Sequence, residues 1–132
     1  MIRQASINDR QVIESFDPFS GSREQDIKED RVFIYVEEGE PCGFISMAKL
    51  LGRPYVQYLA VRPAAQRNGV ASCLLEFIEE KHNQQRLFIS TESDNAPMKT
   101  LLSKRAYVPA GEISGANITG TNELYFYKDN PY

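Results

Sequence analysis

Several residue types that build recognisable sites are scarce in this chain. It has no tryptophan, one histidine (His82) and two cysteines (Cys42 and Cys73) among its 132 residues. Two separated cysteines make neither a disulfide framework nor a zinc motif, and a single histidine cannot supply a multi-histidine metal site or a histidine-based triad. We therefore expect no bound metal, a Cys73 thiol packed on the buried face of a helix, and a surface position for His82.

The chain also lacks an extreme charge and any long apolar run. Its formal net charge is −3, whereas a general nucleic-acid or anionic-membrane surface needs an excess of basic residues. No apolar run approaches the roughly 18 residues that span a bilayer, and the first ten residues contain no secretory hydrophobic segment. We expect a cytoplasmic protein that binds neither nucleic acid nor membranes.

The composition is that of a globular protein, with 42% apolar and 25% charged residues, and the length suits one domain over residues 1–132. Apolar periodicity and turn residues predict a mixed α/β (α+β) fold. Strands are expected at 1–5, 32–36, 43–50, 55–61, 86–91, 107–113 and 123–128, and helices at about 8–16, 22–29, 69–81 and 96–104. The three consecutive strands from 32 to 61 predict an antiparallel meander. The strand–helix–strand order of 55–91 favours parallel pairing of its two strands, although other pairings remain open.

The segment from Tyr55 to Lys81 is the most informative part of the chain. A β-type run is followed by a turn, and from Gly69 apolar residues recur at helical spacing. The first turn of a helix has backbone N–H groups without intrahelical partners, and the helix dipole adds partial positive charge there. A phosphate could therefore bind the N–H groups of roughly Arg67–Ala71, with Arg62 and Arg67 adding charge.

Neither common nucleotide-binding loop is present, because both G-x-G-x-x-G and G-x-x-x-x-G-K-[ST] are absent. The residues are instead Leu59-x-Val61-x-Pro63, then Gln66-x-x-Gly69-x-Ala71, then Leu74-Leu75. This frame resembles the L-x-V-x-P-x-x-R/Q-x-x-G-x-G-x-x-L-L signature of the GCN5-related N-acetyltransferases (GNAT). The alternative interpretation is an ordinary strand–turn–helix connection with a glycine at its corner.

The resemblance implies a GNAT-like fold, with a mostly antiparallel mixed sheet around a central β-α-β unit. It also implies acetyl-coenzyme A (acetyl-CoA) as co-substrate, with its diphosphate on the loop and its pantetheine arm along the preceding strand. The implied cofactor-binding residues are Leu59, Ala60, Val61, Gln66, Arg67, Asn68, Gly69, Val70, Ala71 and Asn95. Asn95 matches the first position of a second family pattern, N-x-x-A-x-x-x-Y-x-x-x-G-F.

Catalytic side chains are less clearly marked. Leu102 stands where the second pattern has the tyrosine that protonates the leaving thiolate, and Ala106 stands where it has glycine. Either Ser103 or Tyr107 substitutes, or the thiolate leaves unassisted, since a thiol pKa near 8.5 permits it. The amine must also lose a proton, and the candidates for this step are Gln57 or Tyr58, which strand alternation puts on opposite faces, and Glu92.

The resemblance implies a primary amine of a small molecule or peptide as acceptor, and it places the first helical region at one wall of the acceptor site. Phe16, Asp17 and Phe19 are candidates to line that wall, with the turns at 37–41 and 52–54 and the loop 114–121 as further parts. The sequence leaves the oligomeric state open and is compatible with a homodimer. Because of Leu102, the alternative function is a CoA-binding regulatory or partner-binding domain with little catalysis, and a purely structural domain is a third interpretation.

Overall fold

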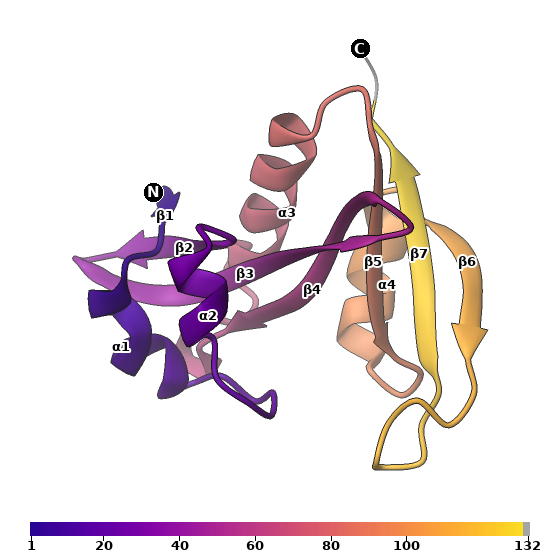
Figure 1. Ribbon diagram of the computed structural model, residues 1–132, viewed down its shortest axis with the longest axis horizontal. Helices are drawn as coiled ribbons and strands as arrows, with labels where there is room; N and C mark the ends of the chain where they lie inside the picture. Colours follow the sequence, from indigo (N-terminus) through magenta and orange to yellow (C-terminus); the bar gives the residue numbers. More distant parts are fainter. Residues whose placement is uncertain (131–132) are drawn as a thin grey trace. The chain divides into compact units, whose positions relative to one another are not determined.

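A computed structural model describes residues 1–130 of the chain (Figure 1). The chain divides into two compact units: Met1–Ala48 with Val56–Lys81 make the first, and Lys49–Tyr55 with the residues from His82 onward make the second. That residues 1–132 form one domain stays a prediction. None of the helices within residues 1–130 is long and apolar enough to cross a membrane.

The first unit contains four strands in the order β1-β2-β3-β4. Its elements are β1 (Ile2–Gln4), the 3₁₀ turn η1 (Ile7–Asp9), α1 (Arg10–Glu14), α2 (Glu24–Lys28), β2 (Val32–Glu37), β3 (Glu40–Leu50), β4 (Arg53–Val61, whose first three residues belong to the second unit), the 3₁₀ turn η2 (Pro63–Ala65) and α3 (Val70–Lys81). β2 is antiparallel to both β1 and β3, so the predicted hairpin of β2 and β3 is confirmed.

The turn between β2 and β3 is shorter than its composition predicted. Glu38 and Gly39, at φ 52° and 81°, form a two-residue turn, and β3 begins already at Glu40. Pro41 is tolerated in this strand because a bulge interrupts the ladder beside it: Tyr35 pairs with Gly43 and Val36 with Pro41, which leaves Cys42 unmatched. The prediction of a turn through residue 41 was therefore wrong in extent.

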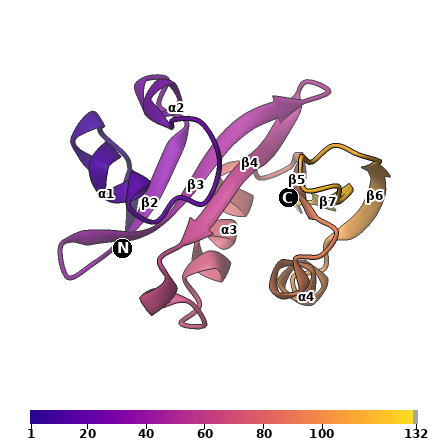
Figure 2. The same ribbon diagram turned by 90° about the horizontal axis from the view of Figure 1, so that it is seen from below.

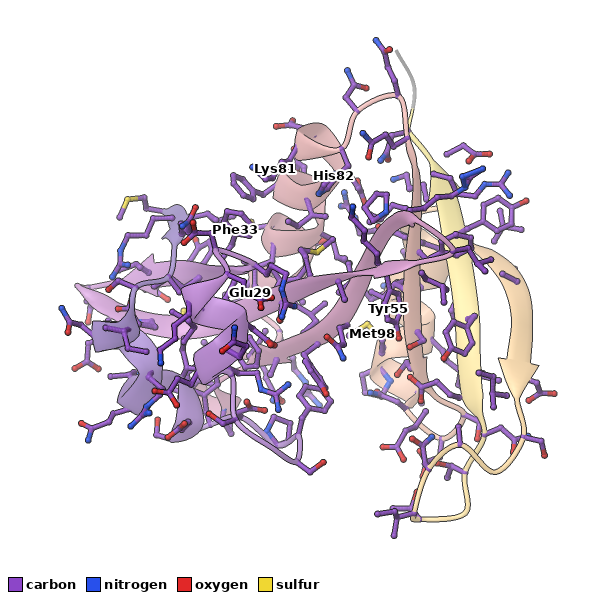
Figure 3. All side chains as sticks on the ribbon, in the orientation of Figure 1. Glu29, Phe33, Tyr55, Lys81, His82 and Met98 are labelled. Atoms are coloured by element: carbon purple, nitrogen blue, oxygen red, sulfur yellow. The ribbon has the colours of Figure 1, made fainter. Side chains whose placement is uncertain are left out.

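Helices cover both faces of this sheet, with α1 and α2 on one side and α3 on the other (Figure 2). Under α1 and α2 lies a cluster of buried apolar residues: Ala5, Ile13, Ile27, Val32, Ile34, Phe44 and Ala60. The α3 face carries the aromatic pair Phe33–Phe77, with ring centroids 5.2 Å apart. Lys81, at the end of α3, lies 5.2 Å from the Phe33 ring (both labelled in Figure 3).

The buried stripe of α3 does not include Cys73, which was predicted to lie on it. Val70, Leu74, Leu75 and Ile78 are buried, whereas Cys73 is exposed. The prediction of a packed Cys73 thiol was wrong because Leu75, not Cys73, completes the stripe. Successive residues are about 100° apart around a helix, so the buried face, centred between Leu74 and Ile78, includes Leu75 and leaves Cys73 outside it.

The second unit contains three antiparallel strands in the order β5-β7-β6, with helix α4 on one face (Figure 2). The elements are β5 (Arg86–Glu92), α4 (Ala96–Lys104), β6 (Val108–Ile113) and β7 (Glu123–Asp129). β7 pairs with β5 along its whole length, and Arg86 forms an ion pair with Asp129 at 2.7 Å. β6 and β7 form the final hairpin, and Tyr107 is buried.

The end of α4 explains why the family pattern has glycine where this chain has Ala106. Ala106 follows the last helical turn in the left-handed region, at φ 66°, and donates its N–H to the Ser103 carbonyl. An L side chain is strained there and glycine is not. We expect Ala106→Gly to raise the free energy of unfolding by up to about 1 kcal/mol. Chemical denaturation measures this gain, and an unchanged or lower stability would contradict it.

Candidate functional site

The connection from β4 to α3 is held at both ends and open in the middle. Ala65 and Val70 are buried, whereas Gln66, Arg67, Asn68 and Gly69 between them are exposed. Arg67 and Gly69 both have positive φ, at 70° and 80°. Two apolar anchors therefore fix a short loop whose backbone turns sharply just before the helix begins.

The start of α3 has the features that an anion requires. The N–H of Cys73 donates to the carbonyl of Gly69, so the N–H groups of the preceding residues lie ahead of the first intrahelical bond. A Cβ built on Gly69 would meet no protein atom within 4 Å, so the space over this backbone is open. Exposed donors, the positive end of a 12-residue helix and open space together fit a phosphate group.

A second glycine, which sequence reasoning missed, seats this helix against the sheet. A Cβ on Gly43 of β3 would lie 2.7 Å from Val70 Cγ1 and 3.4 Å from both the Ala60 carbonyl oxygen and Leu74 Cδ1. The missing side chain thus lets the first turn of α3 approach β3 and β4 closely. The only sequence signal was a glycine inside a strongly β-prone run, which can mark a close backbone approach.

Of the polar side chains around the loop, two are engaged by the protein itself. Arg62 donates to the Pro41 carbonyl at 2.9 Å and pairs with Glu40 at 3.7 Å, so it braces the end of the β2–β3 hairpin. Gln66 Nε2 donates to the Val61 carbonyl at 3.1 Å and so closes the loop back onto β4. The exposed Arg67 carries the charge that lies within the loop itself.

β4 presents its side chains to two faces, as alternation predicted. Tyr58 packs against the cluster under α1 and α2, whereas its neighbour Gln57 is exposed. Leu59 and Ala60 are buried and Val61 is half-buried. Their side chains belong to the fold, so their contribution to a ligand site would come from the backbone.

The predicted acceptor-wall residues of the α1–α2 connection lie beside Tyr58. The ring centroids of Phe19 and Tyr58 are 4.9 Å apart, and Phe16 packs near Phe44 at 6.1 Å. Over the Tyr58 ring lies the guanidinium of Arg23, a buried residue that sequence reasoning did not single out. An arginine at the start of a short polar helix gives no pattern that would have found it.

In the second unit, Glu92 does not stand free at the end of β5. One of its carboxylate oxygens accepts hydrogen bonds from the hydroxyls of Thr119 and Thr121, at 2.9 and 2.8 Å. Glu92 therefore ties the β6–β7 loop to β5.

The remaining candidates of the second unit lie on or beside α4. Asn95 caps the helix by accepting the Met98 N–H through Oδ1. Leu102 is fully buried, and Ser103 is exposed. No side-chain hydroxyl therefore stands at the position of the family's tyrosine.

Tyr55, labelled in Figure 3, begins a chain of short hydrogen bonds in the second unit. Its hydroxyl lies 2.6 Å from Ser90 Oγ, which donates to Glu123 Oε2 at 2.6 Å, and Asn117 donates to the other oxygen of Glu123. Burial raises the pKa of Tyr55 to about 12. Tyr55 therefore stays protonated at neutral pH and acts as the donor at the head of this chain.

The raised pKa of Tyr55 has a measurable consequence. An unfolded tyrosine has a pKa near 10, so the folded state keeps a proton that the unfolded state loses between about pH 10 and 12. Stability linked to this group is complete below about pH 10 and falls as the pH rises through this window. In an ultraviolet titration we expect Tyr55 to ionise near pH 12, in a step that Tyr55→Phe abolishes. A late step that persists in this variant would contradict the assignment.

Within residues 1–130, no group of three or more histidine, cysteine, aspartate or glutamate side chains is arranged to hold a metal ion.

His82 follows α3, where its Nδ1 lies 3.3 Å from Gln85 Oε1 and its carbonyl accepts a hydrogen bond from Asn130. His82 thus helps to hold the chain after α3.

Comparisons with known proteins agree with this geometry. The model of the acetyltransferase (GNAT) family matches residues 3–107, although no curated protein sequence is significantly similar to the chain. Among solved structures, a GNAT-family acetyltransferase from Bacillus cereus ATCC 10987 has a TM-score of 0.85 at 23% identity, covering 98% of this chain and 96% of that one.

Two more distant structures share the fold. The ribosomal-protein-S18-alanine N-acetyltransferase of Escherichia coli has a TM-score of 0.82 at 17% identity, over 100% of this chain and 94% of its own. An acetyltransferase from Bacillus anthracis str. Ames, solved in complex with acetyl coenzyme A, has a TM-score of 0.80 at 15% identity, over 98% of each chain. The fold predicted from the sequence is confirmed, and, because the family model matches most of its length, this chain belongs to the GNAT acetyltransferase family.

Proposed function

We propose that this acetyltransferase binds acetyl-CoA at the β4–α3 loop and transfers the acetyl group to a primary amine of a small molecule or peptide. The observation that carries the proposal is the start of α3, where backbone donors face open space over Gly69. GNAT acetyltransferases use acetyl-CoA, and one structure with the same fold was solved with it. The bound molecule would supply an acetyl thioester, which is already activated for attack by an amine.

In this proposal the main chain holds most of the cofactor. The N–H groups from Gln66 to Ala71 would donate to the diphosphate, with Arg67 adding positive charge. The backbone of Leu59–Val61 would bind the pantetheine arm and donate to the carbonyl oxygen as it gains charge. Asn95 remains a predicted pantetheine ligand and would use Nδ2, because Oδ1 caps α4.

The acceptor amine would attack the thioester directly after losing a proton. An amine with a pKa near 10.4 is neutral in only about one molecule in two thousand at pH 7, so a group that positions the amine or a water helps. Tyr58 is a candidate for this group, because it lies next to the proposed pantetheine-binding residues in sequence. The other candidate, Glu92, already accepts hydrogen bonds from two threonine hydroxyls. Leu102 is buried and has no hydroxyl to protonate the leaving thiolate. Either Ser103 donates this proton or the thiolate leaves unassisted.

A structure with the same fold supports a peptide amine as acceptor. One structure with this fold is named as an N-acetyltransferase of an alanine of ribosomal protein S18, which is a peptide amine. The walls that would select the acceptor are Phe16–Ser22, the hairpin turns and the loop 114–121. The cytoplasmic location and the homodimer stay predictions.

Two measurements test the proposal. Acetyl-CoA at 100 times its dissociation constant should stabilise the protein by about 2.7 kcal/mol, which a thermal shift detects. A free-thiol assay over a panel of small amines and short peptides should then show CoA release with at least one acceptor. No thermal shift would refute the proposal.

The buried Leu102 favours a second candidate, a CoA-binding domain with little turnover. The same two measurements separate this function from the first. A clear thermal shift with no thiol release from any amine in the panel supports the second candidate, and release above the uncatalysed rate excludes it.

A further inference from the structure

The connection between α1 and α2 is built around one buried side chain, that of Arg23. Only 3% of this side chain is exposed, and its Nη2 donates to the Ser20 carbonyl. Its Nε lies 3.3 Å from Asp17 Oδ2, while Asp17 Oδ1 accepts the Phe19 N–H. A Cβ on Gly21 would come within 3.3 Å of the guanidinium. The loop is thus wrapped closely around a charged group.

The same guanidinium covers the ring of Tyr58, with the Arg23 Cζ 3.8 Å from the ring centroid. The Phe19 ring lies 4.9 Å from the same centroid. Tyr58 therefore packs against two groups that both come from one loop. It immediately precedes Leu59–Val61, the residues proposed to bind the pantetheine arm.

Stability does not explain why an arginine occupies this place. A buried ion pair costs desolvation of both charges, and apolar side chains of similar volume are often equally stable or more stable. The ion pair of Arg23 and Asp17 also lacks a hydrogen bond: Arg23 Nε has no acceptor within the described residues, although it lies close to the carboxylate. In addition, burial raises the pKa of Asp17. What arginine adds over an apolar residue is a planar cation that stacks on an aromatic ring in a defined orientation.

We propose that Arg23 is a positioning residue for acetyl transfer: held by Asp17 and the Ser20 carbonyl, it fixes the Tyr58 ring in the orientation in which Tyr58 and Phe19 receive the acceptor amine. The inference rests on the proposed function, because it assumes that the reaction takes place beside β4. Arg23 is too deeply buried to contact the acceptor itself, so its effect passes through Tyr58.

The first test does not depend on activity. In protein labelled with ¹³C-tyrosine, the Tyr58 ring signals are identified among the seven tyrosines by their loss in Tyr58→Phe. Arg23→Met, which keeps an unbranched side chain but removes the charge and the planar group, should shift and broaden these signals. Arg31→Met is the matched control, because Arg31 pairs with Asp26 and Glu29 in the same unit. Unchanged Tyr58 signals in Arg23→Met would overturn the proposal.

The second test separates positioning from structural support. With phenethylamine or a short peptide as acceptor, Arg23→Met should lower kcat/KM for the amine by 10-fold or more and leave the dissociation constant of acetyl-CoA within twofold of wild type. In a Tyr58→Leu background the same substitution should have little further effect, since residues that act as a unit are not additive. Equal losses in both backgrounds, or an equal loss of acetyl-CoA affinity, would contradict the proposal.

A milder variant covers the case in which Arg23→Met does not fold. Asp17→Asn keeps the shape of the partner and removes its charge, so it should move the Tyr58 signals and kcat/KM for the amine in the same direction by a smaller amount. No effect on either quantity would count against the proposal. A wild-type protein that binds acetyl-CoA but acetylates neither probe would contradict the proposed function instead, and the Tyr58 signals would still decide whether Arg23 positions the ring.

Discussion

Gly69→Val is expected to weaken acetyl-CoA binding by about 10- to 100-fold. The β-branched side chain would occupy the open space over the start of α3, where a Cβ now meets no atom within 4 Å. The diphosphate would lose one backbone hydrogen bond to a charged group, worth about 1.5–3 kcal/mol. Isothermal titration calorimetry measures the change in the dissociation constant.

Backbone strain must be separated from this loss of binding. Gly69 has φ 80°, so valine there also lowers the free energy of unfolding by about 1–2 kcal/mol. Gly39, in the β2–β3 turn of the same unit, has φ 81° and the same empty surroundings. Gly39→Val should therefore lose the same stability and bind acetyl-CoA like wild type. Normal binding by Gly69→Val, or equal weakening by both variants, would show that the loop assignment is wrong.

Gly43→Ala is expected to lower the free energy of unfolding by about 1–3 kcal/mol, although it adds a single methyl group. That methyl would lie 2.7 Å from Val70 Cγ1. Valine in a helix has essentially one favourable χ1 rotamer, so the side chain cannot swing aside. The first turn of α3 must move instead, and acetyl-CoA affinity should fall several-fold along with stability. Chemical denaturation and calorimetry on the same variant measure both effects.

A double variant tests the cause of this effect. Val70→Ala removes the clashing methyl groups at the cost of some buried apolar area. In that background Gly43→Ala should cost less than half of what it costs alone, because the two changes share one contact. Additive losses would show that the close approach of β3 and α3 is not what Gly43 provides.

The parts of the site that depend on the main chain could be predicted from the sequence. Strand, turn and helix around Gly69 follow from local rules, because a glycine at a corner and a periodic apolar stripe are visible along the chain. Asn95 as the cap of α4 follows in the same way, and the structure has it in that place. The family frame then gave the fold, which the family model and the solved structures support.

The side-chain partners could not be predicted, because they come from distant segments. Gly43 packs against Val70, which is 27 residues further along the chain, and Arg23 stacks on Tyr58, which is 35 residues further along. Glu92 reads as a solvated carboxylate in sequence, yet Thr119 and Thr121 fold back onto it. Cys73 was misplaced for a more local reason, since the buried face of α3 is centred between Leu74 and Ile78 and includes Leu75 but not Cys73.

The central claim is that main-chain N–H groups at the start of α3 donate to the diphosphate of acetyl-CoA. The most direct measurement is an NMR titration of ¹⁵N-labelled protein with acetyl-CoA, read at the amides of Asn68, Gly69, Val70 and Ala71. These four signals should show some of the largest shifts of the whole chain, in the direction of stronger hydrogen bonding. The claim is contradicted if acetyl-CoA binds and the signals of these four amides do not shift. It is also contradicted if no amide signal of the chain shifts at a saturating concentration of acetyl-CoA.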